Sequence, residues 1–261
     1  MGPMISLASH MHAMKARSEK VAMLTAYDYP TARLLEESGV DVLLVGDSLG
    51  MVVLGFPDTT HVTLDHMAHH TRAVARGRST IHVLADLPYA TYSTPHTAVA
   101  SAKVLIDAGA DAVKLEGGRS HVPQIEALTA AGIPVMAHIG MMPQSVLTEG
   151  GYRIKGKTQE EADRLLEDAA AVQKAGAFGL LLELVVPAVT AQITRSSAIP
   201  TIGIGSGPDC DGQVLVTHDL IGMFPWFTPR FVRPQAQTAS DIKRAATLYV
   251  SQTKTSPGSA E

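Results

Sequence analysis

The chain alternates short apolar runs with segments of helical pattern from residue 21 to residue 220. The apolar runs are continuous, which is typical of strands that are buried on both faces of a parallel sheet. Their regular alternation with helical segments indicates successive βαβ units. The pattern therefore predicts eight parallel strands, over residues 21–28, 41–48, 81–88, 111–118, 133–140, 178–185, 200–207 and 212–220.

Helical segments with start and stop signals lie between most of these runs. Thr63 and Gly77 are placed to begin and end one helix, and Thr158 with Glu161 fits a capping box. We expect helices over 30–39, 63–77, 94–110, 121–131 and 158–177. Eight βα units in 261 residues favour a (β/α)₈ TIM-type barrel over an open doubly wound sheet.

No linker rich in proline or serine interrupts the series of βα units. We therefore predict a single barrel domain over residues 1–261, with a flexible polar tail over about 252–261. An open doubly wound sheet remains the alternative architecture at this point.

Charge and composition exclude several classes of partner. The formal net charge is −4 and no block of lysine and arginine occurs, which argues against nucleic acid and anionic membranes as partners. Cys210 is the only cysteine, so no internal disulfide can form. No apolar run reaches the roughly 18 residues of a membrane span, and the first 20 residues lack an apolar signal core. We expect a soluble, cytoplasmic protein.

Polar side chains stand at the ends of five consecutive predicted strands, the second to the sixth. The carboxyl ends of parallel barrel strands meet at one rim, which is where barrel enzymes carry their chemistry. We therefore expect these side chains to converge on one site. They are Asp47, Ser48, Asp86, Lys114, Glu116, His138 and Glu183.

Each of these residues also has a purely structural interpretation. A single aspartate at a strand end commonly caps a helix or accepts hydrogen bonds in a loop. Lys114 and Glu116 lie two residues apart on one strand face and could form an ordinary ion pair. The recurrence of polar strand ends on five strands in a row favours a functional site over five independent structural roles.

The residue types indicate a particular chemistry. Asp47, Asp86 and Glu116 offer the hard oxygen ligands that suit Mg²⁺. A metal with open positions can chelate a 2-oxo acid and acidify the neighbouring C–H bond. Glu183 follows three leucines, so an apolar setting could raise its pKa and make it the general base.

The sequence resembles the ketopantoate hydroxymethyltransferase (3-methyl-2-oxobutanoate hydroxymethyltransferase) family. The resemblance runs in order from about residue 21 to residue 222, and GDSLGM together with VKLEGG is its most specific part. The matching stretches are TAYDYPTARL, LLVGDSLGMVVLG, HTRAVARG, LADLPY, DAVKLEGG, AHIGMMPQ, GGYRIKGK, IGIGSG and DGQVLVTHDLIG.

The resemblance implies a barrel of the phosphoenolpyruvate/pyruvate superfamily that uses Mg²⁺ and 5,10-methylenetetrahydrofolate. Such an enzyme adds a hydroxymethyl group to 3-methyl-2-oxobutanoate and forms 2-dehydropantoate, the first committed step of pantothenate synthesis. It also implies a homo-oligomer, because many members are decamers.

The resemblance further assigns roles to individual residues. Asp47 and Asp86 would hold the metal and touch the chelated substrate, and Glu116 would complete the metal shell directly or through water. Ser48, Lys114 and His138 would line the oxo-acid site. Glu183 would take the proton from C3 of the substrate. The site residues implied are Asp47, Ser48, Asp86, Lys114, Glu116, His138 and Glu183.

Two other functions remain open. One is a Mg²⁺-dependent 2-oxo acid carbon–carbon lyase or mutase of the same superfamily, although the K-K-C-G-H motif of such lyases is absent. The other is a non-catalytic barrel that binds a metabolite. We assign no metal site to His66, His69 and His70, and we interpret GIGSG at 203–207 as a tight turn rather than a phosphate cradle.

Overall fold

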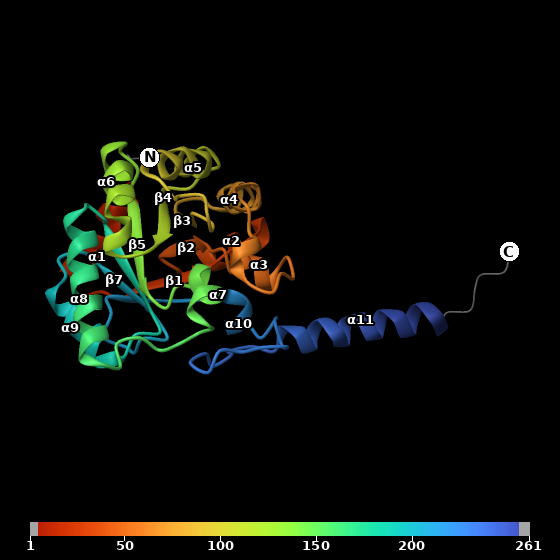
Figure 1. Ribbon diagram of the computed structural model, residues 1–261. Helices are drawn as coiled ribbons and strands as arrows, with labels where there is room; N and C mark the ends of the chain where they lie inside the picture. Colours follow the sequence, from red (N-terminus) through yellow and green to blue (C-terminus); the bar gives the residue numbers. More distant parts are fainter. Residues whose placement is uncertain (1–4, 256–261) are drawn as a thin grey trace. The chain divides into compact units, whose positions relative to one another are not determined.

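The computed structural model describes residues 5–255, and its centre is a closed barrel of eight parallel strands in the order of the sequence (Figure 1). The predicted (β/α)₈ barrel is confirmed, and an open doubly wound sheet is excluded by the closure. The strands are shorter than the apolar runs that predicted them. They are β1 Val21–Thr25, β2 Val42–Val45, β3 His82–Asp86, β4 Ala112–Glu116, β5 Val135–Gly140, β6 Gly179–Glu183, β7 Thr201–Ile204 and β8 Gly212–Leu215.

Within residues 21–214, helices lie on the outside of the barrel between the strands (Figure 1). Several begin where the sequence predicts, because Thr63, Thr94 and Thr158 each accept a hydrogen bond from a backbone N–H of the first turn. The α-helices are α1 Leu7–Ala16, α2 Tyr29–Glu37, α3 Leu49–Val52, α4 Leu64–Gly77, α5 Pro95–Asp107, α6 Val122–Ala130, α7 Val146–Glu149, α8 Gln159–Lys174, α9 Pro187–Ser196, α10 Thr217–Leu220 and α11 Thr238–Thr255.

Several parts of the secondary structure differ from the expectation. The eighth strand ends at Leu215 rather than near residue 220, because residues 217–220 turn into α10. Helices α1, α3, α7, α9 and α11 were not expected. In α1, Leu7, Met11 and Met14 are buried on one face, but the flanking polar residues hide that spacing in the sequence.

The chain divides into two compact units, Met1–Val214 and Leu215–Glu261. The second unit contains α10 and α11, and none of the residues of α11 is buried. Residues 252–255, which we expected in a flexible tail, form the end of α11, and residues 256–261 lie outside the described part of the chain. None of the helices α1 to α11 in residues 5–255 has the length and hydropathy needed to cross a membrane.

The barrel interior forms a core of its own, separate from the layer between barrel and helices. Side chains from alternate positions of the strands pack there with α1, which contributes Leu7, Met11 and Met14. The second core lies between the strands and the outer helices and contains residues of the opposite strand face, such as Val83 and Leu115. This division follows from the two-residue period of a β-strand.

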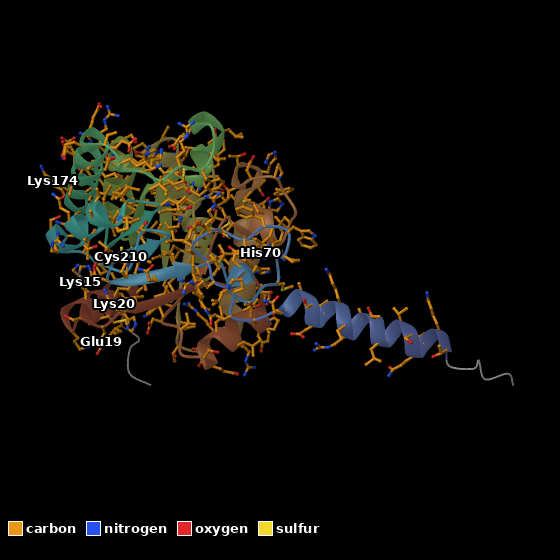
Figure 2. The ribbon with its side chains drawn as sticks, turned by 90° about the horizontal axis from the view of Figure 1, so that it is seen from below. Lys15, Glu19, Lys20, His70, Lys174 and Cys210 are labelled. Atoms are coloured by element: carbon orange, nitrogen blue, oxygen red, sulfur yellow. The ribbon has the colours of Figure 1, made fainter. Side chains whose placement is uncertain are left out.

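Aspartates secure the amino-terminal ends of the strands. Asp41, Asp111 and Asp211 each precede a strand and accept a hydrogen bond of 2.8 Å from a backbone N–H of the strand before. Lys15 of α1 pairs with Asp211 at 2.7 Å, and Lys20 donates to the carbonyl oxygen of Cys210 (Figure 2). These contacts stabilise the rim of the barrel opposite the strand ends that carry the polar side chains.

Candidate active site

The two-residue period of the strands directs the candidate side chains into the barrel. Ala112 and Met136 belong to the interior core, so Lys114, Glu116 and His138 point inward above them. Asp86 follows Leu84, and Glu183 follows Leu181, at the same spacing. Apolar side chains therefore lie beneath a layer of polar side chains at the carboxyl ends of β3 to β6. This polar layer consists of Asp47, Asp86, Lys114, Glu116, His138 and Glu183.

Asp47, Asp86 and Lys114 form the first group of this polar layer. The register pairs Asp86 with Lys114 across β3 and β4, and Lys114 Nζ lies 3.0 Å from Asp86 Oδ1. The backbone N–H of Asp47 donates to Asp86 Oδ2 at 3.1 Å. All three residues are at most 4% exposed. The expected alternative, a Lys114–Glu116 ion pair, is wrong because the ammonium pairs with Asp86 on the neighbouring strand.

Glu116, His138 and Glu183 form the second group. The register places Glu116 beside His138 on β4 and β5. His138 Nδ1 lies 3.6 Å from Glu116 Oε1 and 3.5 Å from Lys114 Nζ, and Nε2 lies 3.5 Å from Glu183 Oε2. His138 thus stands between the two glutamates and next to the first group. The structure brings together six of the seven predicted side chains.

Ser48, the seventh, begins the segment after β2. Its hydroxyl lies 2.8 Å from the Tyr27 hydroxyl, so the two groups share a hydrogen bond at the strand ends of β1 and β2. Ser48 directly precedes α3, and a side chain at Gly46 would contact its hydroxyl and Asp86. The contact with the Ser48 hydroxyl would be only 2.9 Å, so the glycine leaves room for this hydroxyl.

Burial of four carboxyl groups around one ammonium group raises the pKa of each carboxyl group. Burial and the charge of Asp86 raise the pKa of Asp47 to about 7. Burial also raises the pKa of Asp86 and raises that of Glu116 well above its usual range. Burial raises the pKa of Glu183 to about 8, against the opposing effect of Lys114.

The pKa of His138 is shifted in the other direction, downward. Burial and the charge of Lys114 hold the pKa of its imidazole well below the usual value, so the ring is neutral. The polar layer consequently contains four carboxyl groups, one ammonium group and a neutral imidazole. Its negative charge exceeds its positive charge when the carboxyl groups ionise, and this favours a cation as ligand.

The donor set matches a hard divalent cation, although no complete cage is preformed. Asp47 and Asp86 offer carboxylate oxygens within one hydrogen-bonded unit. Among residues 5–255, no three His, Cys, Asp or Glu side chains stand in an arrangement that could hold a metal ion by themselves. Mg²⁺ takes one or two carboxylates and keeps water or substrate as its other ligands, so two aspartates suffice for it.

Sequence reasoning missed three residues that contact the predicted ones. They are Tyr27, described above, Gln144, and Tyr92, whose hydroxyl lies 3.3 Å from the Glu116 carbonyl oxygen. The Gln144 side chain donates to Asp47 Oδ2 at 2.8 Å, and the Tyr92 hydroxyl donates to Gln144 Oε1 at 2.5 Å. Both residues are buried. Gln144 follows β5 within the MMPQ stretch, so its place beyond a barrel strand was the available signal.

The features that we did not assign to function have structural roles. The ring of His66 accepts the N–H of Thr63 at 3.2 Å in the capping box of α4, and His70 Nδ1 lies 2.6 Å from the Tyr27 carbonyl oxygen. In the GIGSG turn, Ser206 Oγ donates to Leu182 O at 2.8 Å and accepts from Val185 N at 3.0 Å. Cys210 is buried.

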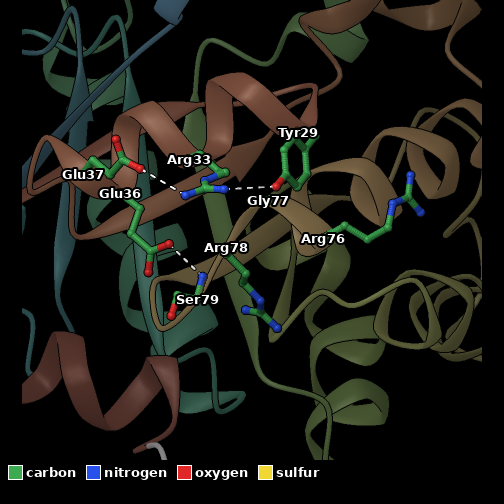
Figure 3. Close-up of a pocket in the computed structure, with 8 residues that line it drawn as sticks. All are labelled: Tyr29, Arg33, Glu36, Glu37, Arg76, Gly77, Arg78 and Ser79. Atoms are coloured by element: carbon green, nitrogen blue, oxygen red, sulfur yellow. Dashed lines mark hydrogen bonds and ion pairs between the residues drawn. The ribbon is translucent and has the colours of Figure 1, made fainter.

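A hollow of about 370 Å³ lies on the outer surface, where α2 meets the end of α4 (Figure 3). Most of its charged groups have partners: Arg33 contacts Tyr29 and Glu37, and Glu36 accepts hydrogen bonds from the backbone N–H groups of residues 79–81. Arg78 pairs with Asp111. The hollow is thus an ion-paired seam between helices, apart from the buried polar layer.

Comparisons with known proteins identify the family of the chain. The family model described as ketopantoate hydroxymethyltransferase matches residues 6–257. A 3-methyl-2-oxobutanoate hydroxymethyltransferase from Moorella thermoacetica is 48% identical over 241 residues, which cover 92% of this chain and 90% of the relative.

Solved structures of similar fold are much more distant in sequence. A 2,3-dimethylmalate lyase, described as a PEP mutase/isocitrate lyase superfamily member, has a TM-score of 0.63 at 17% identity, with 99% of this chain and 91% of the other covered. A phosphonopyruvate hydrolase in complex with oxalate and Mg²⁺ has a TM-score of 0.63 at 13% identity, with coverage of 96% and 99%. They show the fold alone. By its family match and its curated relative, the chain belongs to the ketopantoate hydroxymethyltransferase family of enzymes.

Proposed function

We propose that this enzyme transfers a hydroxymethyl group from 5,10-methylenetetrahydrofolate to 3-methyl-2-oxobutanoate and so forms 2-dehydropantoate. Membership of the family supports the reaction. The observation that carries the mechanism is the buried polar layer, in which four carboxyl groups surround Lys114 and the neutral His138. A small, charged oxo acid fits such a layer better than an apolar ligand does.

Asp47 and Asp86 would hold Mg²⁺ in this site, with Glu116 as a further ligand directly or through water. The excess of buried carboxylates supports this assignment, because a divalent cation would offset their mutual repulsion. A distant structure of the same fold is described with oxalate and Mg²⁺ bound. The bound ion supplies Lewis acidity that polarises the keto oxygen of the substrate.

The residues of the chain bind and orient the oxo acid. Lys114 would stabilise the negative charge that develops on the keto oxygen, since its ammonium is held by Asp86 at the centre of the layer. The Ser48 hydroxyl would donate to the substrate carboxylate, oriented by Tyr27. The neutral His138 would line the pocket between Glu116 and Glu183.

Glu183 would be the general base. Its carboxylate takes the proton from C3 of the oxo acid, and the electron pair of the C–H bond moves into the enolate. Water hydrolyses the methylene bridge of the folate: both C–N bonds of the bridge break, tetrahydrofolate leaves with the two protons of the water, and the one-carbon unit is released at the oxidation level of formaldehyde. C3 of the enolate then bonds to this carbon, and its oxygen takes the proton held by Glu183 and becomes the new hydroxyl. A raised pKa makes Glu183 a stronger base than an exposed carboxylate, although a smaller fraction of it is ionised at neutral pH.

A carbon–carbon lyase or mutase of the same superfamily is the second candidate. Its support is similarity of fold, for example to 2,3-dimethylmalate lyase at 17% identity. The lyase motif K-K-C-G-H does not occur in the sequence, and the single cysteine, Cys210, is buried. The high identity to a curated transferase favours the transfer reaction.

Two separate assays test the proposed function. The purified protein should consume 3-methyl-2-oxobutanoate only when Mg²⁺ and 5,10-methylenetetrahydrofolate are both present, with 2-dehydropantoate as product. Cleavage of a branched 2-hydroxy acid without folate would instead support the lyase. A cytoplasmic location and a homo-oligomer, with a decamer as the family's common form, complete the proposal.

A further inference from the structure

Gln144 is hydrogen-bonded to two of the acidic residues of the polar layer at once. Its side-chain Nε2 donates to Asp47 Oδ2 at 2.8 Å, and its backbone N–H donates to Glu116 Oε2 at 3.0 Å. Asp47 follows β2 and Glu116 ends β4, so Gln144 connects carboxylates that come from different sides of the layer. Gln144 is 5% exposed, so water cannot easily replace these bonds.

The orientation of the Gln144 amide is determined by its partners. Nε2 faces two acceptors, Asp47 Oδ2 and the Leu87 carbonyl oxygen at 2.9 Å. Oε1 faces the Tyr92 hydroxyl, which is a donor, at 2.5 Å. A flipped amide would set oxygen against both acceptors and leave the hydroxyl opposite an NH₂ group, so only one orientation satisfies all the bonds.

Tyr92 is in turn held by the scaffold. Its carbonyl oxygen accepts a hydrogen bond of 3.3 Å from Gln124 Nε2 of α6, and its side chain is 7% exposed. The chain of bonds therefore runs from an outer helix through Tyr92 and Gln144 to Asp47. These bonds restrict the rotation of the Asp47 carboxylate, because both polar atoms of the Gln144 amide are engaged by buried partners.

We propose that Gln144 is a positioning residue that aims the carboxylates of Asp47 and Glu116 at the cation site, and that Tyr92 fixes the amide of Gln144 for this task. The inference rests on the proposed function, since it assumes that these carboxylates serve a divalent cation. The alternative is that Gln144 only anchors the segment after β5. An anchor would contribute to stability but not to the affinity for a cation.

The experiment titrates Mg²⁺ into the metal-free full-length protein by calorimetry, well below the melting temperature of each variant. Gln144→Met keeps the length of the side chain but removes its donors. Tyr92→Phe keeps Gln144 and removes only the hydroxyl. Tyr89→Phe is the matched control, because Tyr89 lies in the same loop after β3 but is 50% exposed.

Gln144→Met should weaken Mg²⁺ binding by about 10- to 100-fold, the usual effect of losing a partner behind a metal ligand. Tyr92→Phe should weaken it by about 2- to 10-fold, the value of one hydrogen bond. Tyr89→Phe should bind Mg²⁺ like the wild type. If Gln144→Met does not fold, Tyr92→Phe decides the question alone.

Unchanged Mg²⁺ affinity in the folded variants, with only a lower melting temperature, would overturn the positioning role and leave the proposed function intact. Failure of the wild type itself to bind Mg²⁺ would contradict both the proposed metal site and this inference. The two failures are therefore distinguished by the behaviour of the wild type.

Discussion

The ammonium group of Lys114 lies 3.0 Å from Asp86 Oδ1, with both side chains nearly excluded from solvent. The charges of Asp86, Glu116 and Asp47 raise the pKa of Lys114, so it remains charged despite its burial. It is the one ammonium placed among four carboxyl groups in the polar layer. If Lys114 binds the substrate as proposed, the loss of this pair should affect both substrate affinity and the stability of the barrel.

Replacement of Lys114 should affect both properties. Lys114→Met should weaken binding of 3-methyl-2-oxobutanoate by roughly 10- to 100-fold, since a charged hydrogen-bond donor is lost. It should also destabilise the metal-free protein by about 3–5 kcal/mol, because Asp86 is left buried without its partner. Calorimetry with the oxo acid and chemical denaturation measure the two effects. The exposed Lys103→Met on α5 is the control, and loss of stability with unchanged oxo-acid affinity would contradict the binding role.

Asp86 provides the test of the proposed metal ligands. Asp86→Asn keeps the shape and removes the charge, so Mg²⁺ affinity should fall by more than the roughly 10- to 100-fold that loss of an outer partner costs. Titration of Mg²⁺ into the metal-free variant measures this. Asp107→Asn, at the exposed end of α5, should bind like the wild type. If Asp86→Asn bound Mg²⁺ with the affinity of the wild type, Asp86 would not be a metal ligand.

Glu183 should make the stability of the metal-free protein depend on pH. Its pKa is raised from 4.5 to about 8, so the folded state binds its proton more tightly than the unfolded state. This stabilisation is complete below about pH 4.5 and is lost as the pH rises through about 8. Glu183→Gln should therefore gain stability relative to the wild type as the pH rises from 5 to 8. Melting curves over this range would show parallel pH dependences if Glu183 did not titrate in this way.

Asp111, at the other rim of the barrel, should make the stability of the protein depend on pH in the acidic range. Although burial acts to raise its pKa, hydrogen bonds from His82 and Arg78 lower it to about 2. Its stabilisation is present above the usual pKa of 3.8 and is lost as the pH falls through about 2. Asp111→Asn should destabilise the protein by about 1–3 kcal/mol at pH 7. The difference in free energy of unfolding between wild type and Asp111→Asn should be smaller at pH 3 than at pH 7. An equal difference at the two pH values would show that the pKa of Asp111 is not lowered by folding.

The fold and the polar layer could be predicted because both follow from local pattern. Continuous apolar runs predicted parallel strands, and the two-residue period predicted that Lys114 and Glu116 share a face. In parallel strands of a barrel, equivalent positions come together at one rim, so Asp86 and His138 could be expected near them.

The partners of these residues could not be predicted, because they depend on the path of loops. Gln144 and Asp47 are separated by 97 positions in the sequence, and nothing local indicates their contact. The pairing of Lys114 with Asp86 rather than Glu116 depends on the register between β3 and β4. Helix α11 was not predicted, and only its residues from 252 onward fell in the expected tail. None of its residues is buried.

The proposed mechanism depends most on Glu183, which would act as the base that removes the C3 proton of the oxo acid. The direct measurement is exchange of that proton with D₂O, followed by NMR, with Mg²⁺ present and folate omitted. Glu183→Gln should slow the exchange by roughly 10²- to 10⁴-fold, while binding of Mg²⁺ and of the oxo acid persists. Exchange at the wild-type rate in this variant would contradict the assignment, and His138, 3.5 Å from Glu183, would become the candidate base.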